Sequence, residues 1–283
     1  MESDLQELNR WRSISSFGLL ALLLAWESLS PYFAWFAGAA RERVLHGLKN
    51  VALGISNAFI TGAVFAALWW TTVQWAQAHD FGVLHWFPLP TGARLAVAFL
   101  LIDCWMYWWH RFNHVIPFLW RLHRMHHSDA QMDVTTASRF HIGEIALSNV
   151  LRVPVIVLLG LGLRELVLYE AAMFAVVQFH HANVALPAWF DRTLRMVIVT
   201  PFLHKVHHSR WRRETDSNYS ALFSFWDRVF RSFRMRDNPH TVQFGLQEFD
   251  GEENHTLPGL LATPFKQVQR ATDQPPIRTN PSL

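Results

Sequence analysis

Cysteine is almost absent from this chain of 283 residues, and its scarcity excludes several kinds of site. The single cysteine, Cys104, has no partner for an intramolecular disulfide. A thiolate metal site needs several cysteines and is equally unsupported. The same scarcity excludes an iron–sulfur cluster held by this chain alone.

Charge is also scarce. Only 17% of the residues are charged, against about 25% in a typical soluble domain, and 51% are hydrophobic. The net charge of +3 is too small and too dispersed to predict nucleic-acid binding, and a cytoplasmic membrane surface accounts for it better. We therefore expect several membrane segments mixed with a sizeable polar portion.

Three sequence patterns that carry chemistry elsewhere are missing. The chain has no GxGxxG dinucleotide fingerprint, no recognisable haem domain and no HExxH motif. Electrons for any redox reaction must therefore come from a separate protein. A zinc-dependent hydrolase of the usual kind would lack its carboxylate base.

Long apolar runs predict an all-α protein with several membrane helices. The runs cover residues 17–37, 51–76 and 95–109, and a longer one from 145 to about 177 is interrupted by GLGLRE. About 20 apolar residues suit one membrane span. The last run predicts a helical hairpin, whose two arms are short for full spans, so partial insertion stays an alternative.

The basic residues orient these helices. Loop 79–90 has no Lys or Arg, whereas arginines are dense after the third run. The positive-inside rule then places this loop outside and the histidine-rich segments in the cytoplasm. The first helix stays unoriented, because positive charge flanks both of its ends. Residues 183–250 are expected to form a helical cap against the cytoplasmic headgroups.

Histidine is abundant, and half of the sixteen histidines lie in three clusters with helical spacing. These are His110 and His114; His123, His126 and His127; and His204, His207 and His208. Residues three and four apart share a helix face, so each cluster can aim its imidazoles at one point. Imidazole binds iron, zinc, copper and nickel. Eight ligands exceed the four of a tetrahedral zinc site, and this number suits two metal ions.

The clusters have other interpretations. A single histidine pair on a helix is more often structural, and histidine-rich helices can also face anionic lipid. Three clusters of the same geometry on one side of the membrane favour a metal site. A metal transporter would place its ligands near mid-membrane, whereas these clusters follow the ends of apolar runs. A zinc-dependent membrane hydrolase is the other alternative.

The order of the clusters resembles the fatty acid hydroxylase/sterol desaturase superfamily of integral membrane di-iron enzymes. Its signature of HxxxH, HxxHH and a distant HxxHH occurs here as HRFNH, HRMHH and HKVHH. DCWMYWWHR, TTASRFH and HHANV resemble the flanking segments, and the likeness covers about half the chain. Three positions depart from the pattern: Ser220 replaces the glycine of NYG, Arg231-Ser232 replaces the Gly-Thr of WDxxFGT, and Ile142 replaces a proline after His141.

The resemblance implies nine metal-ligating histidines, namely His110, His114, His123, His126, His127, His181, His204, His207 and His208. His180 competes with His181 for the ninth place, because adjacent residues on a helix diverge by about 100 degrees. Three roles stay open for His141: a ligand, a partner of a ligand, or a cap on the preceding loop.

Two carboxylates, Asp103 and Glu144, are expected to act in the site by accepting the free N–H of a ligating ring. Asp103 lies seven residues before His110, which is two helical turns, so the two share a face. A helix–helix hydrogen bond is the alternative for this carboxylate in an apolar run. Asp129 and Asp216 are further candidates for such a partner.

The activity implied by the resemblance is O2-dependent hydroxylation or desaturation of an unactivated C–H bond in a lipid. The lipid is a fatty acyl chain, a sterol or a lipid headgroup. Two iron ions are the expected cofactors, with zinc replacing iron in some purified material. The electron donor is an external reductase or ferredoxin-like protein, for which Arg210, Arg212 and Arg213 offer a dock; these arginines could equally bind phospholipid.

The expected organisation has four parts. A polar segment covers residues 1–16, membrane helices cover 17–94, the catalytic domain covers 95–250, and a loosely ordered tail covers 251–283. The chain is short and has no lysine-rich retrieval tail. We therefore expect an integral protein of a bacterial inner membrane.

Overall fold

The computed structural model describes residues 2–270, and this part of the chain is helical, with no strand. Two isolated bridges, Pro31 with Val184 and Ile198 with Phe223, are its only β-type pairings. The prediction of an all-α protein is confirmed.

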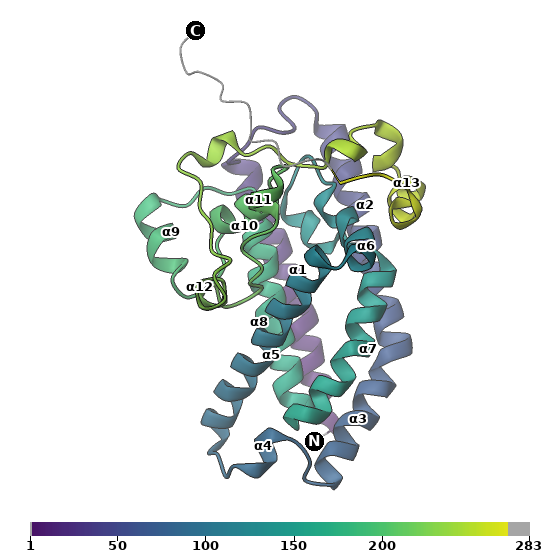
Figure 1. Cartoon of the computed structure of the whole chain (residues 1–283), viewed down its shortest axis with the longest axis vertical. Helices are drawn as coiled ribbons and strands as arrows, with labels where there is room; N and C mark the ends of the chain where they lie inside the picture. The colour runs from purple at the N-terminus through teal and green to yellow at the C-terminus, as the bar shows by residue number, and fades with distance from the viewer. Residues whose placement is uncertain (1, 271–283) are drawn as a thin grey trace.

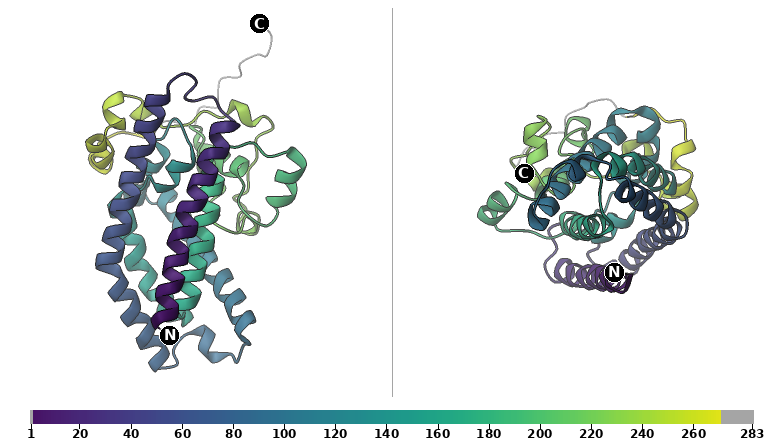
Figure 2. Two further views of the ribbon diagram at one scale, coloured as in Figure 1. Left: turned by 180° about the vertical axis from the view of Figure 1, so that it is seen from behind. Right: turned by 90° about the horizontal axis from the view of Figure 1, so that it is seen from below.

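Long helices stand side by side and form a bundle (Figure 1 and Figure 2). They are α1 (Glu2–Leu29), α2 (Ala40–Ile60), α3 (Ala66–Ala78), α5 (Thr91–Val115), α7 (Ile142–Leu159) and α8 (Leu163–His181). One π-helical turn, η1 (Thr61–Phe65), joins α2 to α3. The chain is thus helical from Ala40 to Ala78. The short α4 (Val83–Trp86) lies at the end of the bundle where the N-terminus also lies.

Shorter helices cover the opposite end of the bundle and form a cap (Figure 1). They are α6 (Pro117–His127), η2 (Val134–Ser138), α9 (Ala188–Leu194), α10 (Pro201–His207), α11 (Arg212–Thr215), α12 (Phe225–Val229), η3 (Pro239–Thr241), η4 (Gln247–Phe249), η5 (Glu252–His255), α13 (Leu257–Leu261) and η6 (Thr263–Phe265).

Two helical stretches are long and apolar enough to cross a membrane. These stretches are Ala40–Trp86 and Ile142–Leu159, with mean hydropathies of 1.9 and 1.8, and Ile14–Leu29 is a shorter apolar helix. Large apolar side chains such as Phe17, Ile55 and Phe59 point outward from the bundle. Such an outer surface suits lipid better than water.

The first helix differs from its prediction, because it ends at Leu29 instead of continuing to residue 37. Two causes lie next to this end. Pro31 disfavours helical backbone at the residue before it. The buried Glu27 carboxylate accepts hydrogen bonds from the backbone N–H groups of Val134 and Asn183, at 3.1 and 2.9 Å, so it ties α1 to the cap.

The basic segment 40–50, which precedes the second apolar run, forms the first turns of α2. Two of its polar residues, His46 and Asn50, are buried and find partners in the cap. His46 contacts Asp129 at 2.9 Å, and Asn50 donates to Thr135 at 3.0 Å. These buried contacts hold the start of α2 in helical form.

The predicted helical hairpin is present as α7 and α8. Gly160 ends α7 in the left-handed region, with φ 67°, where a side chain would also collide with the backbone of Phe81. Arg94 fixes this turn by donating to the backbone oxygens of Gly160 and Leu84, at 2.8 and 2.6 Å. The hairpin therefore returns α8 to the histidine end of the bundle.

The tail predicted to be loosely ordered is packed as far as residue 270, so the prediction does not describe this part. Arg124 donates to the backbone oxygens of Thr263 and Lys266, both at 2.6 Å. Arg270 pairs with Asp216 at 2.7 Å. These arginines bind tail carbonyls and a carboxylate, a pairing that composition alone does not reveal. Residues 271–283 of the predicted tail lie outside the described residues.

Candidate metal centre

Four helices bring the clustered histidines together at the capped end of the bundle. The last turns of α5 carry His110 and His114, and α6 carries the HRMHH cluster directly after Pro117 turns the chain. The end of α8 supplies His181. Helix α10, capped by Thr200, carries the HKVHH cluster. The i, i+3, i+4 spacing of the last two clusters puts their rings on one side of each helix.

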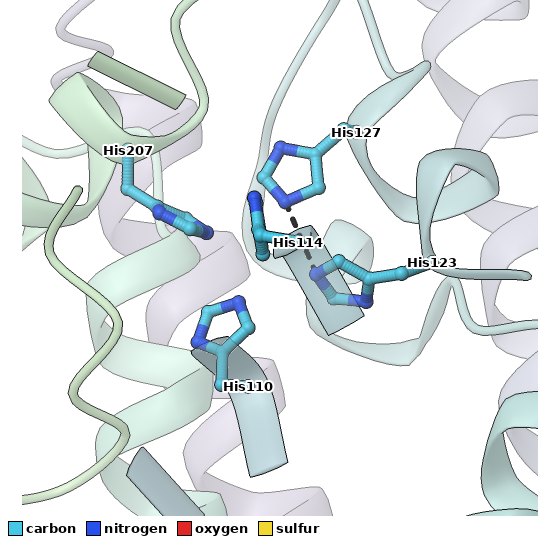
Figure 3. A group of neighbouring side chains, drawn as sticks. All are labelled: His110, His114, His123, His127 and His207. Carbon is cyan, nitrogen blue, oxygen red and sulfur yellow. Dashed lines mark hydrogen bonds between the residues drawn. The ribbon is translucent and has the colours of Figure 1, made fainter. Parts of the chain in front are cut away.

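The rings meet in two groups that are able to hold metal ions, and within each group the ligand atoms lie within 4.8 Å of one another. One group contains His110, His114, His123, His127 and His207, and the other contains His126, His181, His204 and His208. Figure 3 shows the five rings of the first group around a common centre. These nine histidines are the set that the resemblance implies as ligands.

Hydrogen bonds on the outer side of the rings decide which nitrogen faces inward. In six rings, Nδ1 contacts an oxygen atom at 2.6–3.4 Å: His110, His114, His123, His126, His181 and His207. Carbonyl and carboxylate oxygens accept hydrogen bonds, so Nδ1 carries the proton. The Nε2 atom of each neutral ring is then unprotonated, and its lone pair faces the other rings.

His126 and His181 show the consequence of this arrangement. Each ring donates its Nδ1–H to a backbone oxygen, and their Nε2 atoms are only 3.1 Å apart. Two lone pairs at this distance repel each other, and a bound cation turns the repulsion into attraction. In the other group, the buried Nε2 atoms of His114 and His207 have no hydrogen-bond partner among the described residues. Both observations fit a metal ion in each group.

Burial keeps the rings of the cap in the neutral form that binds metal. It lowers the pKa of His126, His127, His204 and His208 well below the ordinary value of 6.5, and neighbouring histidines lower it further. Burial also lowers the pKa of His207 to about 3. These groups are therefore ready to coordinate at neutral pH.

An apolar cavity of about 250 Å³ leads from both histidine groups into the bundle between α5, α7 and α8. His110 and His123 line its upper end from one group, and His126, His181 and His204 from the other. Trp109, Phe140, Phe174 and Val177 are among its apolar lining residues. The cavity has the character of a site for an elongated apolar ligand.

Comparison with known proteins agrees with this geometry. Residues 95–232, which hold all nine grouped histidines, match the sequence model of the fatty acid hydroxylase family. In this region, just under half of the chain, the sequence is that of the fatty acid hydroxylase family. The predicted superfamily and the class of oxidoreductases are thereby confirmed.

Curated relatives of this chain include lipid-oxidising enzymes. Ornithine lipid hydroxylase OlsE of Rhizobium tropici is 25% identical over 267 residues, 92% of this chain and 77% of that protein. Alkylglycerol monooxygenase of Danio rerio is 30% identical over 159 residues, 53% of this chain. C-4 methylsterol oxidase of Candida albicans is 27% identical over 152 residues, 52% of this chain. The chain spans 33% of the monooxygenase and 49% of the sterol oxidase. No solved structure matches it.

Of the two carboxylates expected in the site, Glu144 lies beside a grouped histidine. Its Oε1 accepts from Nδ1 of His123 at 2.9 Å and from the side chain of Asn113 at 3.3 Å. Asp216 similarly lies 3.4 Å from Nδ1 of His114. Both carboxylates can fix the orientation of the ring that they contact.

Asp103 differs from its prediction, because its hydrogen bonds bypass the histidines. Its carboxylate accepts from the Tyr169 hydroxyl at 2.7 Å, the Trp226 ring N–H at 3.0 Å and the backbone N–H of Phe223 at 2.9 Å. Two helical turns before His110, the same face of α5 meets α8 and the loop before α12. Asp103 thus ties α5 to α8, as in the alternative role, and also holds that loop.

Asp129 likewise makes no hydrogen bond to a grouped histidine among the described residues. It pairs with His46 on α2 and accepts from the hydroxyl of Thr136 on η2. Although burial opposes ionisation, His46 and Arg139 hold the pKa of Asp129 well below its usual range. This carboxylate therefore stabilises the shell around η2.

His141 and His180 lie outside both groups. His141 caps α7 by accepting the backbone N–H of Gly143 at 3.0 Å, and its other nitrogen lies 3.3 Å from the backbone oxygen of Leu261. His180 stacks on the ring of His204, with ring centres 3.8 Å apart. Both residues thus support the site from outside.

Sequence reasoning missed the backbone acceptors of the site. The carbonyl oxygens of Tyr219, Ser217 and Arg139 receive the Nδ1–H groups of His110, His207 and His126. Backbone oxygens leave no side-chain signal, although the NY pair at Asn218 marks one of these loops. Arg152, a cation inside the apolar α7 that lines the cavity, was also missed; its charge was the available signal.

Proposed function

We propose that this protein is a membrane-bound di-iron oxygenase that hydroxylates, or desaturates, an unactivated C–H bond of a lipid. One observation carries the proposal: nine imidazoles, from eight buried histidines and the half-buried His110, converge in two groups, with Nε2 lone pairs as close as 3.1 Å. Two adjacent cation sites built from neutral nitrogen ligands suit iron. The match to the fatty acid hydroxylase family supports the same assignment.

The protein would hold one iron with the group of five histidines and the other with the group of four. Bound iron supplies the capacity to activate O2 with two external electrons and to oxidise a C–H bond. The chain's own residues do the rest. Oxygen acceptors on Nδ1, including Glu144 and Asp216, orient the rings and keep Nε2 free. The buried site excludes water from the reacting carbon.

The cavity defines the class of substrate. Its walls between α5, α7 and α8 are mainly apolar, and its upper end is formed by members of both histidine groups. An acyl chain or another elongated lipid would therefore present one carbon to the metals. The relatives' names cover an ornithine lipid, an alkylglycerol and a methylsterol. All three are lipids, which supports a lipid substrate for this chain.

We propose a membrane placement with the cap in the cytoplasm. The helices that carry the histidine groups end opposite α4 in the bundle (Figure 1). Helix α4 lies within loop 79–90, which has no basic residues. On the side of the cap, α9 and the segment after it expose Trp189 and Met196, and α12 exposes Val229. Exposed arginines, Arg192 and Arg228, lie among these apolar side chains. This face suits contact with anionic headgroups of a bacterial inner membrane.

Residues 95–250 are retained as the proposed catalytic unit, against which the tail packs as far as residue 270. An external reductase or ferredoxin-like protein supplies the electrons. Two of the arginines expected at its dock already pair with acids: Arg210 with Asp250 at 2.6 Å and Arg212 with Asp216 at 3.1 Å. Both arginines stay partly exposed, so they can still attract an acidic partner.

The test combines metal analysis with a product search. Full-length protein expressed in iron-supplemented medium should contain two irons per chain, one for each group, and a His126→Ala/His207→Ala variant should lose both. Lipids of cells that express the wild type should contain a species heavier by one oxygen atom, or lighter by two hydrogen atoms, that the variant lacks. Wild-type protein that binds no metal would overturn the proposal. Zinc alone would support the metal site, and the product search would then decide the chemistry.

A further inference from the structure

Arg152 is a buried cation at the end of the cavity that lies farthest from the histidines. It is on α7, eight residues after Glu144, whose carboxylate contacts His123. Eight residues advance a helix by about 12 Å. Met173, which also lines the cavity, lies eight residues before His181 on α8. The two helices thus place Arg152 and Met173 at the same depth.

The guanidinium of Arg152 has few good acceptors, although the residue is only 8% exposed. Nη1 donates to the carboxylate of Glu170, while Nη2 meets only the Sδ atom of Met106, at 3.5 Å. The ring of Trp69 lies against the guanidinium, 4.8 Å from its centre. Nε–H has no hydrogen-bond partner among the described residues. A buried donor without an acceptor is costly, and thioether sulfur is a weak acceptor.

We propose that Arg152 binds an oxygen atom of the lipid substrate at the far end of the cavity. Glu170 already neutralises the charge of Arg152, so a neutral hydroxyl or carbonyl oxygen fits better than a second carboxylate. The proposal rests on the proposed function, because the opposite end of the same ligand would face the two histidine groups. The substrate class becomes a lipid with an oxygen atom remote from the carbon that is oxidised.

The arrangement would also select against simple alkyl chains. A methyl end at this depth would leave Nη2 with only the weak acceptor Sδ of Met106, which lines the cavity, and would bring hydrocarbon against an ion pair. An oxygen-bearing end satisfies the donor and fixes how far the ligand enters. Arg152 is in this sense a positioning and specificity residue, whose effect is measurable without turnover.

The test compares two probes that differ by one hydroxyl, dodecanol and dodecane. Each competes with fluorescent cis-parinaric acid for the iron-loaded, full-length protein in the same detergent. Because removing Arg152 alone would take away the cation that pairs with Glu170, the main variant is Arg152→Met/Glu170→Met. Arg164→Met is the matched control, because this arginine is exposed on α8 and does not line the cavity.

Wild type should prefer dodecanol, and the ratio of the two affinities should fall roughly tenfold in the double variant. The control should keep the wild-type ratio, which cancels the unequal partitioning of the probes into detergent. An unchanged ratio in the folded double variant would overturn the role of Arg152. Iron content, measured on the same samples, separates this outcome from failure of the proposed function, because probe binding needs no metal chemistry.

A second measurement does not depend on the folding of a variant. Dodecanol with a diazirine next to its hydroxyl is cross-linked to wild-type protein, and the labelled peptides are identified by mass spectrometry. Labels should fall on α7 around Arg152 and on α8 around Met173. Labels around His123 and Glu144 would place the hydroxyl at the histidine end and contradict the proposal.

Discussion

The Nδ1–H of His123 donates to Oε1 of Glu144 over 2.9 Å, and both side chains are buried. This contact joins α6, which carries one histidine cluster, to the first turn of α7. Glu144 therefore accepts the Nδ1–H of His123, as backbone oxygens accept the Nδ1–H of other rings of the site. It fixes the protonated nitrogen and leaves Nε2 free for a cation.

Replacing Glu144 by glutamine should weaken metal binding without abolishing it. The amide oxygen can still accept from His123, but the negative charge that strengthens the ring as a ligand is lost. Loss of such a partner lowers metal affinity by roughly ten- to a hundredfold. Competition with a metal chelator measures the effect. Glu165→Gln is the control, because this carboxylate pairs with Arg94 at the far turn and should leave the affinity unchanged.

Asp103→Ala should destabilise the fold while leaving iron affinity unchanged. The substitution strands several buried donors, including the hydroxyl of Tyr169 and the ring N–H of Trp226. The expected loss is roughly 3 kcal/mol or more in the free energy of unfolding. A lower melting temperature in detergent, with full metal content after loading at low temperature, would agree. Loss of metal affinity from folded protein would instead make Asp103 a partner of the site.

The histidine spacing and the apolar runs were sufficient to predict the bundle, the hairpin and the three histidine clusters, whereas the ninth grouped histidine, His181, was implied by the family resemblance. Spacing of three and four residues fixes which rings share a helix face, and this local property does not depend on the rest of the fold. The pairing of helices was different. The role of Asp103 depends on the position of the loop before α12 relative to α5, and Glu27 closes α1 through a contact with Val134. Such long-range contacts have no local sequence signal.

The tail and the arginines illustrate the same limit. Arg124 and Arg139 count as positive charge in a topology argument, yet both are buried and donate to oxygen atoms of the protein. Their partners lie in segments that sequence composition describes only as polar. A residue's charge is visible in the sequence, whereas the acceptor that neutralises it is set by packing.

His180 and His181 should differ in their effect on metal content. His181 belongs to the group of four, whereas His180 stacks on His204 without joining either group. His181→Ala should therefore lose the iron of that group and keep the other. His180→Ala should retain both irons, with at most lower affinity at the group of four. Metal analysis of the two purified variants decides, and iron loss from His180→Ala alone would exchange their roles.

The stability of the metal-free protein should decrease as the pH falls below 6.5, because its buried histidines resist protonation. The buried cap histidines have pKa values below the ordinary 6.5, and that of His207 is about 3. Between these two pH values the unfolded chain binds more protons than the folded one, so the stability of the fold decreases as the pH falls. The melting temperature of chelator-treated protein should drop through this window. Iron-loaded protein should resist longer, because protons must displace the metal.

Arg231 occupies the position at which the family pattern has glycine, and its φ of 59° lies in the left-handed region. This conformation costs a non-glycine residue about 1 kcal/mol. The turn must keep it, because Asp227 receives the backbone N–H groups of Ser232 and Phe233 at its carbonyl oxygen, at 2.7 and 3.0 Å. Arg231→Gly should therefore raise the free energy of unfolding by a few tenths to 1 kcal/mol, since the extra freedom of glycine in the unfolded chain offsets part of the gain.

The matched control is Arg234→Gly, three residues along the chain, where φ is not positive. This change should lower stability slightly, because it adds freedom to the unfolded chain without relieving strain. Thermal unfolding of both variants in one detergent gives the comparison. Equal destabilisation by the two substitutions would show that the Arg231 side chain stabilises the turn by more than its backbone strain costs.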